Sequence, residues 1–411
     1  MSAPAPIAII GGGPGGLTLA RFLERAGLLY TIFERDSSPS ENGQGGSLDI
    51  HPGTGLAALD AAGLRDEFEK FARHEAAVFS LQDSQGGNSF RSEAGEGDHD
   101  RPEIDRRQLR NLLLESIPTD RVRWGKGLKA VERDESTGED GAKGWVLKFV
   151  DGTAERGFRM VVGADGAFSA VRSLITPAKP KYSGRTYIEG RLTPSNPQYA
   201  SAQSLAGPGI FVAMGAGGII LLQQMCDKTY RVYAGITESN TGVTRPGGTL
   251  DFSTTENIEK ARSTLLDRYT GWAEHLRAFV THAEGPWRVW PLYTLEAEVF
   301  APEAPWTRAP GVTVLGDAAH LALPNGEGVN TAMLDALKLS EALTAELKLS
   351  NEGDDAAAIE RAIVKYEKEM RKHAAEHIQD GIMMCDMMFH PDGAERMIAF
   401  FKSFEDAAAQ A

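Results

Sequence analysis

Three glycines near the start of the chain have the spacing of a dinucleotide-binding loop. Gly11, Gly13 and Gly16 follow the apolar run Ile7–Ile10 and open a stretch with apolar residues at helical spacing. In such a loop the first glycine allows a tight turn, the second lets a pyrophosphate approach the backbone, and the third lets helix and strand pack closely. The helix N-terminus then faces the phosphate charge. The pattern predicts a nucleotide site at the end of the first strand.

An acidic residue follows where such a site needs one. Glu34 lies 18 residues after Gly16, in the strand-like stretch Tyr30–Arg35. A carboxylate there can accept a hydrogen bond from a ribose 2′-hydroxyl. The glycine pattern does not distinguish FAD from NAD, and the alternative is an ordinary glycine-rich turn.

Two further motifs favour FAD. Val162-Gly163-Ala164-Asp165-Gly166 follows one predicted strand, and Gly316-Asp317-Ala318-Ala319-His320 follows another, Val312–Leu315. Either alone could be a strand-to-turn junction, because Asp and Gly are common in turns. Their order behind the glycine loop makes the combination specific.

With these motifs the chain resembles the class A flavoprotein aromatic hydroxylases, which have the para-hydroxybenzoate hydroxylase fold. The resemblance is closest to the tetracycline-inactivating flavin monooxygenases. It extends over most of the chain and is weaker in the middle third. Those enzymes share the pattern of Phe33-Glu34-Arg35-Asp36, of Gly45-Gly46-Ser47-Leu48-Asp49-Ile50-His51, and of Pro102-Glu103-Ile104-Asp105-Arg106 with Leu109-Arg110.

The resemblance implies a set of FAD contacts. Glu34 would bind the adenosine ribose, and Arg35 would lie near the adenine. Asp49 would lie beside the isoalloxazine ring, Arg110 would contact the FAD linker, and Asp317 would hold the ribityl chain. The residues expected to bind the cofactor are Gly11, Gly13, Gly16, Glu34, Arg35, Asp49, Arg106, Arg110, Asp165, Gly166, Gly316, Asp317, Gly328, Val329 and Asn330.

Two pairs of these residues have an alternative or an additional interpretation. Arg106 and Arg110 lie one helical turn apart and could form a solvated helix face beside Glu103. In the resemblance, Asp165 and Gly166 would serve the nicotinamide cofactor as well as FAD.

The loop Leu323–Asn330 opens the last helix of the nucleotide domain and, in the family, borders the flavin pyrimidine. A helix N-terminus supplies partial positive charge and free N–H groups to an anionic reduced flavin. Here the loop is one residue shorter than the family pattern. It has Asn325 and Glu327 in place of a small residue and Gln, which changes the geometry expected at the flavin.

Substrate residues follow from the resemblance by position. Glu189, Ile210 and Tyr233 fall where the family grips tetracycline, but none has the residue type that the family uses. The segment Met383–Phe389 is rich in methionine. A methionine on a helix more often belongs to the core than to the wall of a pocket, although methionine suits adaptable pockets. We expect a flat, polycyclic, oxygen-rich substrate between the flavin and an inserted sheet, covered by the C-terminal helix. The expected substrate residues are Glu189, Ile210, Leu222, Tyr233, Pro324 and Phe389.

The elements around these motifs predict an α/β protein: a Rossmann-type FAD-binding domain with an inserted mixed-sheet substrate domain and a C-terminal helix. We expect residues 1–75, 101–178 and 286–350 in the FAD-binding domain, 76–100 and 179–285 in the sheet domain, and 351–411 as a C-terminal helical segment. Strands are predicted at Ile7–Ile10, Tyr30–Arg35, Gly144–Val150, Arg156–Val162 and Val312–Leu315, and helices at Leu56–Ala62, Arg106–Ser116, Ile258–Phe279, Gly328–Leu347 and Ala356–Phe404.

One apolar run is nearly long enough for a membrane-spanning helix. Leu205–Leu222 carries no charge, but it contains Pro208 and five glycines. Two strands joined by a glycine-rich turn explain the run better.

Composition narrows the classes of partner. The 411 residues carry a formal charge of −14, with the acidic residues scattered, which argues against nucleic acid and anionic membranes. Cys226 and Cys385 lie far apart with only His390 near either, which excludes a disulfide framework or a Cys-rich metal site. Residues 1–6 lack signal-peptide features, so a reducing, cytoplasmic compartment is expected. We assign no catalytic residue and no metal ligand, because a histidine such as His320 is more often structural.

The expected function is a single-component monooxygenase that uses FAD, NADPH or NADH, and O₂ to hydroxylate an aromatic molecule, as a monomer or weak dimer. The sequence has no second glycine loop of this kind, so the nicotinamide would bind transiently. A tetracycline-like substrate would imply antibiotic resistance. The alternatives are a flavoprotein dehydrogenase or oxidase, a non-catalytic FAD-binding redox protein, and a flavin-dependent halogenase, the last disfavoured by the late position of Trp287–Pro291.

Overall fold

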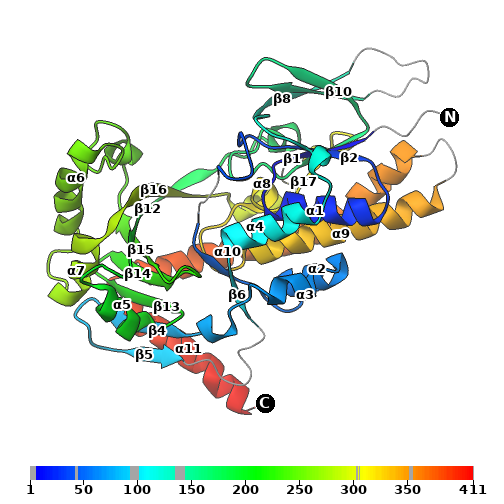
Figure 1. Ribbon diagram of the computed structural model, residues 1–411. Coiled ribbons are helices and arrows are strands. Elements are labelled where there is room, and N and C mark those ends of the chain that lie inside the picture. Colours follow the sequence, from blue (N-terminus) through cyan, green and yellow to red (C-terminus); the bar gives the residue numbers. More distant parts are fainter. Residues whose placement is uncertain are drawn as a thin grey trace. The chain divides into compact units, whose positions relative to one another are not determined.

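A computed structural model describes residues 6–41, 45–92, 101–134, 144–301, 304, 306–350 and 355–410 (Figure 1). The chain divides into two compact units. Unit 1 comprises Met1–Ala72, Arg106–Lys181 and Thr294–Gly381, and unit 2 comprises Arg73–Asp105, Tyr182–Tyr293 and Ile382–Ala411. Residues 351–411, expected as a segment of their own, are thus divided between the units at Gly381.

Unit 1 is built on a five-stranded parallel sheet. Ile7 lies between Tyr30 and Met160 of the neighbouring strands, and all four residues of the first strand are buried. Near-continuous apolar strands are typical of a parallel sheet covered on both faces. In spatial order the strands are β17 (Val312–Val314), β11 (Met160–Gly163), β1 (Ile7–Ile10), β2 (Tyr30–Phe33) and β7 (Val122–Arg123).

Helices and a small second sheet complete unit 1. Helix α1 packs against α9 and α4 (Figure 1). Phe33 of β2 contacts Phe149 and Phe158 of the small sheet, with ring centroids 5.0 and 5.6 Å apart. The unit contains α1 (Pro14–Arg25), β3 (Ser47–Asp49), α2 (Gly55–Ala62), α3 (Arg65–Glu69), α4 (Arg106–Glu115), β8 (Leu128–Arg133), β9 (Trp145–Phe149), β10 (Ala154–Phe158), α8 (Asp317–His320), α9 (Gly328–Leu349) and the part of α10 (Asp355–Met388) up to Gly381.

The predicted strand Arg156–Val162 is wrong as a single element. Strand β10 ends at Phe158 in the small antiparallel sheet, and β11 begins at Met160 in the parallel sheet. Strands β9 and β10 pair antiparallel on either side of Asp151-Gly152, a dipeptide typical of hairpin turns. The alternation of side chains and the apolar content of a sequence do not reveal that the chain passes from one sheet to another within two residues.

Unit 2 is built on a seven-stranded mixed sheet. The apolar run Leu205–Leu222 contains two of its strands, as predicted, and Ala216 and Gly217 in the connecting turn have φ of +48° and +76°. Two successive residues with positive φ are typical of a type I′ hairpin turn. In spatial order the strands are β16 (Glu284–Thr294), β12 (Lys181–Leu192), β15 (Tyr230–Thr237), β14 (Gly218–Gln224), β13 (Ile210–Gly215), β4 (Phe79–Asp83) and β5 (Phe90–Ser92).

Helices cover one face of this sheet. Side chains of α5 (Tyr199–Ala206), α6 (Thr255–Asp267) and α7 (Glu274–His282) form a core with those of the strands. The predicted helix Ile258–Phe279 is therefore two helices, separated at Gly271, whose φ is +83°. Unit 2 also holds β6 (Glu103–Asp105), α11 (Gly393–Gln410) and the last turns of α10. None of the described helices is long and apolar enough to cross a membrane.

The fold generates a stability prediction at Tyr269, which is fully buried in this core. Its hydroxyl donates to the carbonyls of Ile219 and Gly235, at 3.0 and 2.9 Å. We expect Tyr269→Phe to lower the free energy of unfolding of unit 2 by about 1 kcal/mol, because a buried hydrogen bond is lost. The matched control is Tyr199→Phe, whose hydroxyl bonds the Lys228 carbonyl at the surface. Equal urea midpoints for the two variants would contradict the prediction.

Candidate active site

The glycine loop has the geometry that its sequence predicts. A Cβ on Gly11, where φ is +107°, would lie 2.2 Å from the carbonyl oxygen of Ala164, and one on Gly16 would lie 2.2 Å from that of Gly11. Both positions therefore require glycine for a close approach of backbones. Gly13 differs, since its Cβ would meet nothing within 4 Å, and it is the N-cap of α1. The space beside Gly13 is where the resemblance places the pyrophosphate.

Glu34 supports the same loop from the end of β2. Its buried carboxylate accepts hydrogen bonds from the N–H of Gly12 at 2.5 Å and of Asp36 at 2.9 Å. Carboxylate lone pairs remain after these two bonds, so Glu34 can still accept from a ribose hydroxyl. Arg35 is exposed.

Arg110 is buried against the loop rather than part of a solvated helix face. Its Nε donates to the Gly12 carbonyl at 3.1 Å, its Nη2 pairs with Asp36 at 3.0 Å, and its guanidinium lies 5.5 Å from the Trp124 ring centroid. Arg106, one turn earlier, is exposed. The two arginines thus differ: Arg110 fixes the protein side of the loop, and Arg106 is free to reach a ligand.

Arg172 connects the two Asp-containing motifs, a role that the sequence motifs did not predict. Its Nη1 donates to the Ala318 carbonyl at 3.1 Å and its Nη2 to the Ala167 carbonyl at 2.7 Å. Burial lowers the pKa of Arg172, while the charges of Asp165 and Asp317 oppose that shift. Because Arg172 donates to a carbonyl of each loop, it holds the two loops together at the same edge of the sheet.

The aspartates of these motifs have different surroundings. Asp165 accepts a hydrogen bond from the Ala170 N–H at 2.8 Å, so it shapes its own turn, next to Gly166. The Asp317 side chain is exposed and makes no hydrogen bond to other described residues. Asp317 at the start of α8, just after Gly316, is thus available to a ligand hydroxyl.

A buried histidine–aspartate network supports the second motif from behind. Asp335 on α9 is fully buried and accepts from the Gly316 N–H at 2.9 Å, His320 Nε2 at 2.7 Å and His373 Nε2 at 3.2 Å. Burial disfavours charge on both Asp335 and His320. Their mutual attraction nevertheless raises the pKa of His320 and lowers that of Asp335. Burial and the nearby His320 charge lower the pKa of His377 to about 4.

This network is structural in its geometry. The ligand-type atoms of His320, Asp335 and His373 lie within 4.8 Å of one another, but the Asp335 oxygens already accept three hydrogen bonds. A metal ion would have to replace bonds that fix Gly316. We therefore interpret the cluster as the support of the Asp317 loop.

The segment after β3 and the loop before α9 lie together, as the resemblance implies. Asn330 is fully buried; its Oδ1 accepts from the His51 N–H at 2.8 Å and its Nδ2 donates to the Asp49 carbonyl at 2.9 Å. His51 bridges two carboxylates, Asp49 Oδ2 at 2.6 Å and Glu327 Oε1 at 2.8 Å. Gly328 and Val329 begin α9 beside them. Glu327, where the family has Gln, is therefore one of the two carboxylates that pair with His51. The sequence motifs did not predict this triplet of charged groups.

Protonated His51 is the favoured form at neutral pH. Burial disfavours the charge, but the hydrogen bonds to Asp49 and Glu327 outweigh it and raise the pKa of His51 to about 9. With two carboxylates and one imidazolium the triplet has a net charge of −1.

Four of the six predicted substrate residues share one face of the unit 2 sheet. Glu189 and Tyr233 are directly opposite each other on β12 and β15. Ile210 of β13 lies on the same side, because its cross-strand neighbours Gln223 and Arg231 do. Phe389 reaches this face through the ring of Tyr187, at a centroid distance of 6.1 Å.

The other two lie elsewhere. Leu222 is fully buried in the core beneath α5 to α7, on the opposite face, so we leave it out of the substrate site that we propose. Strand alternation puts successive residues on opposite faces, and a shift of one position decides between them. Pro324 is exposed and belongs to unit 1.

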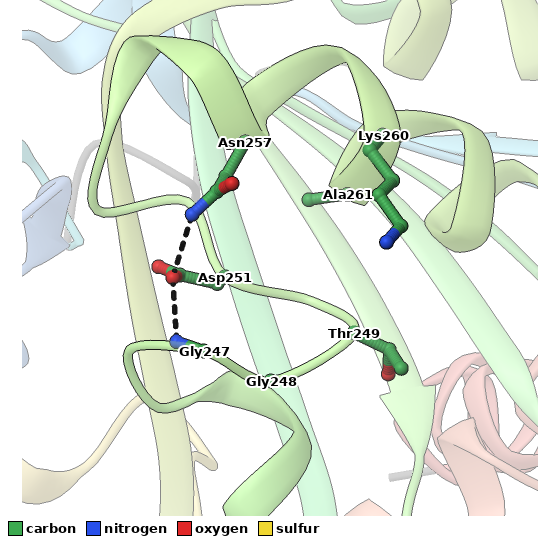
Figure 2. A pocket seen from close by; sticks show the side chains of 7 residues that line it. All are labelled: Gly247, Gly248, Thr249, Asp251, Asn257, Lys260 and Ala261. Carbon is green, nitrogen blue, oxygen red and sulfur yellow. Dashed lines mark hydrogen bonds between the residues drawn. The ribbon is translucent and has the colours of Figure 1, made fainter.

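A small depression in unit 2 has no part in this site. It has a volume of about 100 Å³ and is lined by Gly247, Gly248, Thr249, Asp251, Asn257, Lys260 and Ala261 (Figure 2). Asp251 accepts from the Gly247 N–H at 2.8 Å and from Asn257 Nδ2 at 2.9 Å. These bonds hold the loop before α6.

The described residues of unit 1 fit FAD. Open space beside Gly13 at a helix N-terminus suits a pyrophosphate, Glu34 suits a ribose, and exposed Asp317 suits the ribityl hydroxyls.

The contrast between two glycines makes this fit testable. We expect Gly13→Ala to weaken FAD binding at least tenfold, because its methyl group would occupy the open space of the pyrophosphate. The stability of the apoprotein should change by less than about 1 kcal/mol. Gly16→Ala should instead destabilise the apoprotein, since its Cβ meets the Gly11 carbonyl. FAD titration and thermal melts of both apoproteins provide the measurement, and unchanged FAD affinity in Gly13→Ala would refute the placement.

The His51 triplet generates a pH prediction. The folded-state pKa of about 9 lies above the ordinary 6.5, so its stabilisation is complete below about pH 6.5 and is lost as the pH rises to 9. We expect the melting temperature of the wild type to fall relative to that of His51→Gln over this range. His282→Gln, an exposed histidine of unit 2, is the control and should run parallel to the wild type. Parallel curves for His51→Gln would count against the triplet.

Comparison with known proteins identifies the family. A family model described as FAD binding domain matches residues 4–191 and 303–380. Monooxygenase penA of Penicillium thymicola is 31% identical over 434 residues, covering 95% of this chain and 97% of that protein.

Solved structures show the same fold at lower identity. HpxO of Klebsiella pneumoniae, solved with FAD and uric acid, has a TM-score of 0.72 and 20% identity, with 98% of this chain and 93% of that chain covered. Tetracycline destructase Tet(55) has a TM-score of 0.68 and 16% identity, with 97% and 94% covered. The predicted fold class is confirmed. The chain belongs to the FAD binding domain family and is a class A FAD-dependent monooxygenase.

Proposed function

We propose that this monooxygenase takes electrons from NADPH or NADH and hydroxylates an aromatic, fused-ring molecule recognised by the unit 2 sheet. The proposal rests on one observation in each unit: open space beside Gly13 with the exposed Asp317 in unit 1, and a polar and aromatic sheet face in unit 2. Bound FAD would supply the redox chemistry, accepting a hydride and passing an oxygen atom from O₂ to the substrate.

The chain's own residues would hold the flavin and set its charge. Gly13 would admit the pyrophosphate, Gly11 and Gly16 would allow the close backbone approaches that shape the loop, and Asp317 would orient the ribityl chain. The His51 triplet is net negative, so stabilisation of an anionic reduced flavin would come from the N–H groups at the start of α9, at Gly328 and Val329.

The nicotinamide would bind transiently. The described residues form one parallel nucleotide-binding sheet, and the sequence has one glycine loop of this kind. A co-substrate that leaves after hydride transfer does not need a second domain of that type.

The substrate proposal rests on the sheet face and on the relatives together. Aromatic rings at Tyr187, Tyr233, Trp290 and Phe389 suit a flat ring system, and offset ring stacking contributes beyond area burial. The destructase Tet(55) acts on a fused-ring antibiotic by its name, but it shares only the fold. A tetracycline-like compound is therefore one candidate among fused-ring aromatics.

Isotope labelling tests the reaction. We expect NAD(P)H oxidation to consume O₂ and ¹⁸O₂ to place one labelled atom in the product. The measurement is product mass with substrate present, for tetracyclines, anthraquinone-type polyketides and simple phenols in parallel. Turnover that continues at full rate without oxygen, with an artificial electron acceptor, would favour a dehydrogenase. Turnover of simple phenols alone would overturn the fused-ring proposal.

A further inference from the structure

The unit 2 sheet has one face covered by helices and one face with charged side chains. On β12, Arg185, Glu189 and Arg191 alternate with core residues such as Ile188. Because side chains alternate along a strand, these three share the face away from the core. Arg231 of β15 lies directly opposite Arg191 and so belongs to the same face.

Glu189 is the centre of this group. Only 1% of its side chain is exposed, and its Oε2 accepts a hydrogen bond from Trp290 Nε1 at 2.8 Å. Its Oε1 has no hydrogen-bond donor among the described residues. Arg231 Nη1 and Arg288 Nη1 lie 3.6 and 3.8 Å from it, which is too far for hydrogen bonds.

The positive charges on this face therefore exceed the one negative charge of Glu189. Arg191, Arg231 and Arg288 carry three positive charges against one on Glu189, a net of +2. Arg191 has no ion pair with any residue that the structure describes, whereas Arg185, earlier on β12, is paired with Asp386 at 2.6 Å.

Two features of this excess positive charge favour a further, negatively charged binding partner. Like charges directly opposite on neighbouring strands destabilise a sheet, and Arg191 and Arg231 are such a pair. Both have a buried Nε without a hydrogen-bond partner in the described part of the chain. An arginine fork matches the two oxygens of a carboxylate.

We propose that these three arginines bind a carboxylate on the aromatic substrate, with Glu189 as the positioning residue that holds Arg231 and Arg288. The substrate would thus be an aromatic acid, with its ring against Tyr187 and Tyr233, whose ring centroids lie 6.2 Å apart on this face. This inference rests on the proposed function, because it assumes that the sheet face receives the substrate.

The experiment compares acids with their neutral amides on the FAD-loaded protein, without NAD(P)H. The probes are benzoate and benzamide, 2-hydroxybenzoate and 2-hydroxybenzamide, and 2-naphthoate and 2-naphthamide, with Kd measured by equilibrium dialysis. We expect at least one acid to bind about tenfold or more tightly than its amide, and its affinity to fall with added salt.

Variants then locate the preference. Arg191→Gln should reduce the acid-to-amide ratio about tenfold and leave amide binding unchanged, and it removes no ion pair of the described structure. Arg231→Lys keeps the charge and loses the fork, so it should also reduce the ratio. Arg268→Gln, which breaks the exposed pair with Glu238 at 2.7 Å, is the matched control and should leave the ratio unchanged.

The outcomes separate this inference from the proposed function. It is overturned if no acid binds, if amides bind as tightly as acids, or if Arg191→Gln keeps the ratio. Labelled oxygen in a neutral aromatic product would then leave the proposed function standing. If acids bind in a way that depends on the arginines but no labelled oxygen enters the product, the carboxylate site is supported and the proposed hydroxylation is overturned.

Discussion

The close approach of two backbones at the glycine loop is the constraint on which unit 1 depends. Gly11 and Ala164 come so near that a single Cβ at Gly11 would overlap the Ala164 carbonyl. That contact brings the end of β1 beside the end of β11, and it directs the start of α1 toward open space at Gly13. A nucleotide site at the carboxyl edge of the sheet follows from this one steric fact.

Buried charged groups then fix the loops around that edge. Arg110, Arg172 and Asp335 each bind backbone groups from a distant part of the chain. An unpaired buried charge is costly, so each of these side chains specifies one loop arrangement. The cofactor residues therefore lie on loops that are held by charge-assisted hydrogen bonds within the protein.

In unit 2 the two faces of one sheet have different roles. The face beneath α5 to α7 carries apolar side chains and supplies stability, and the other carries arginines, aromatic rings and Glu189. Because alternation assigns neighbours to opposite faces, core and recognition can change independently along the same strands. This separation suits a family whose members share a fold while their names record different substrates.

The sequence by itself determined the glycine loop, the two Asp motifs and most elements, because these depend on local backbone geometry and on periodicity. It also separated the apolar run Leu205–Leu222 into two strands. Only the tertiary structure decided that Arg156–Val162 divides between two sheets, that Leu222 faces the core, and that Arg110 is buried while Arg106 is exposed. Glu327, one of the two partners of His51, and the partners of Glu189 also come from distant segments. Which side chains meet across strands and loops is set by packing, and no local pattern encodes it.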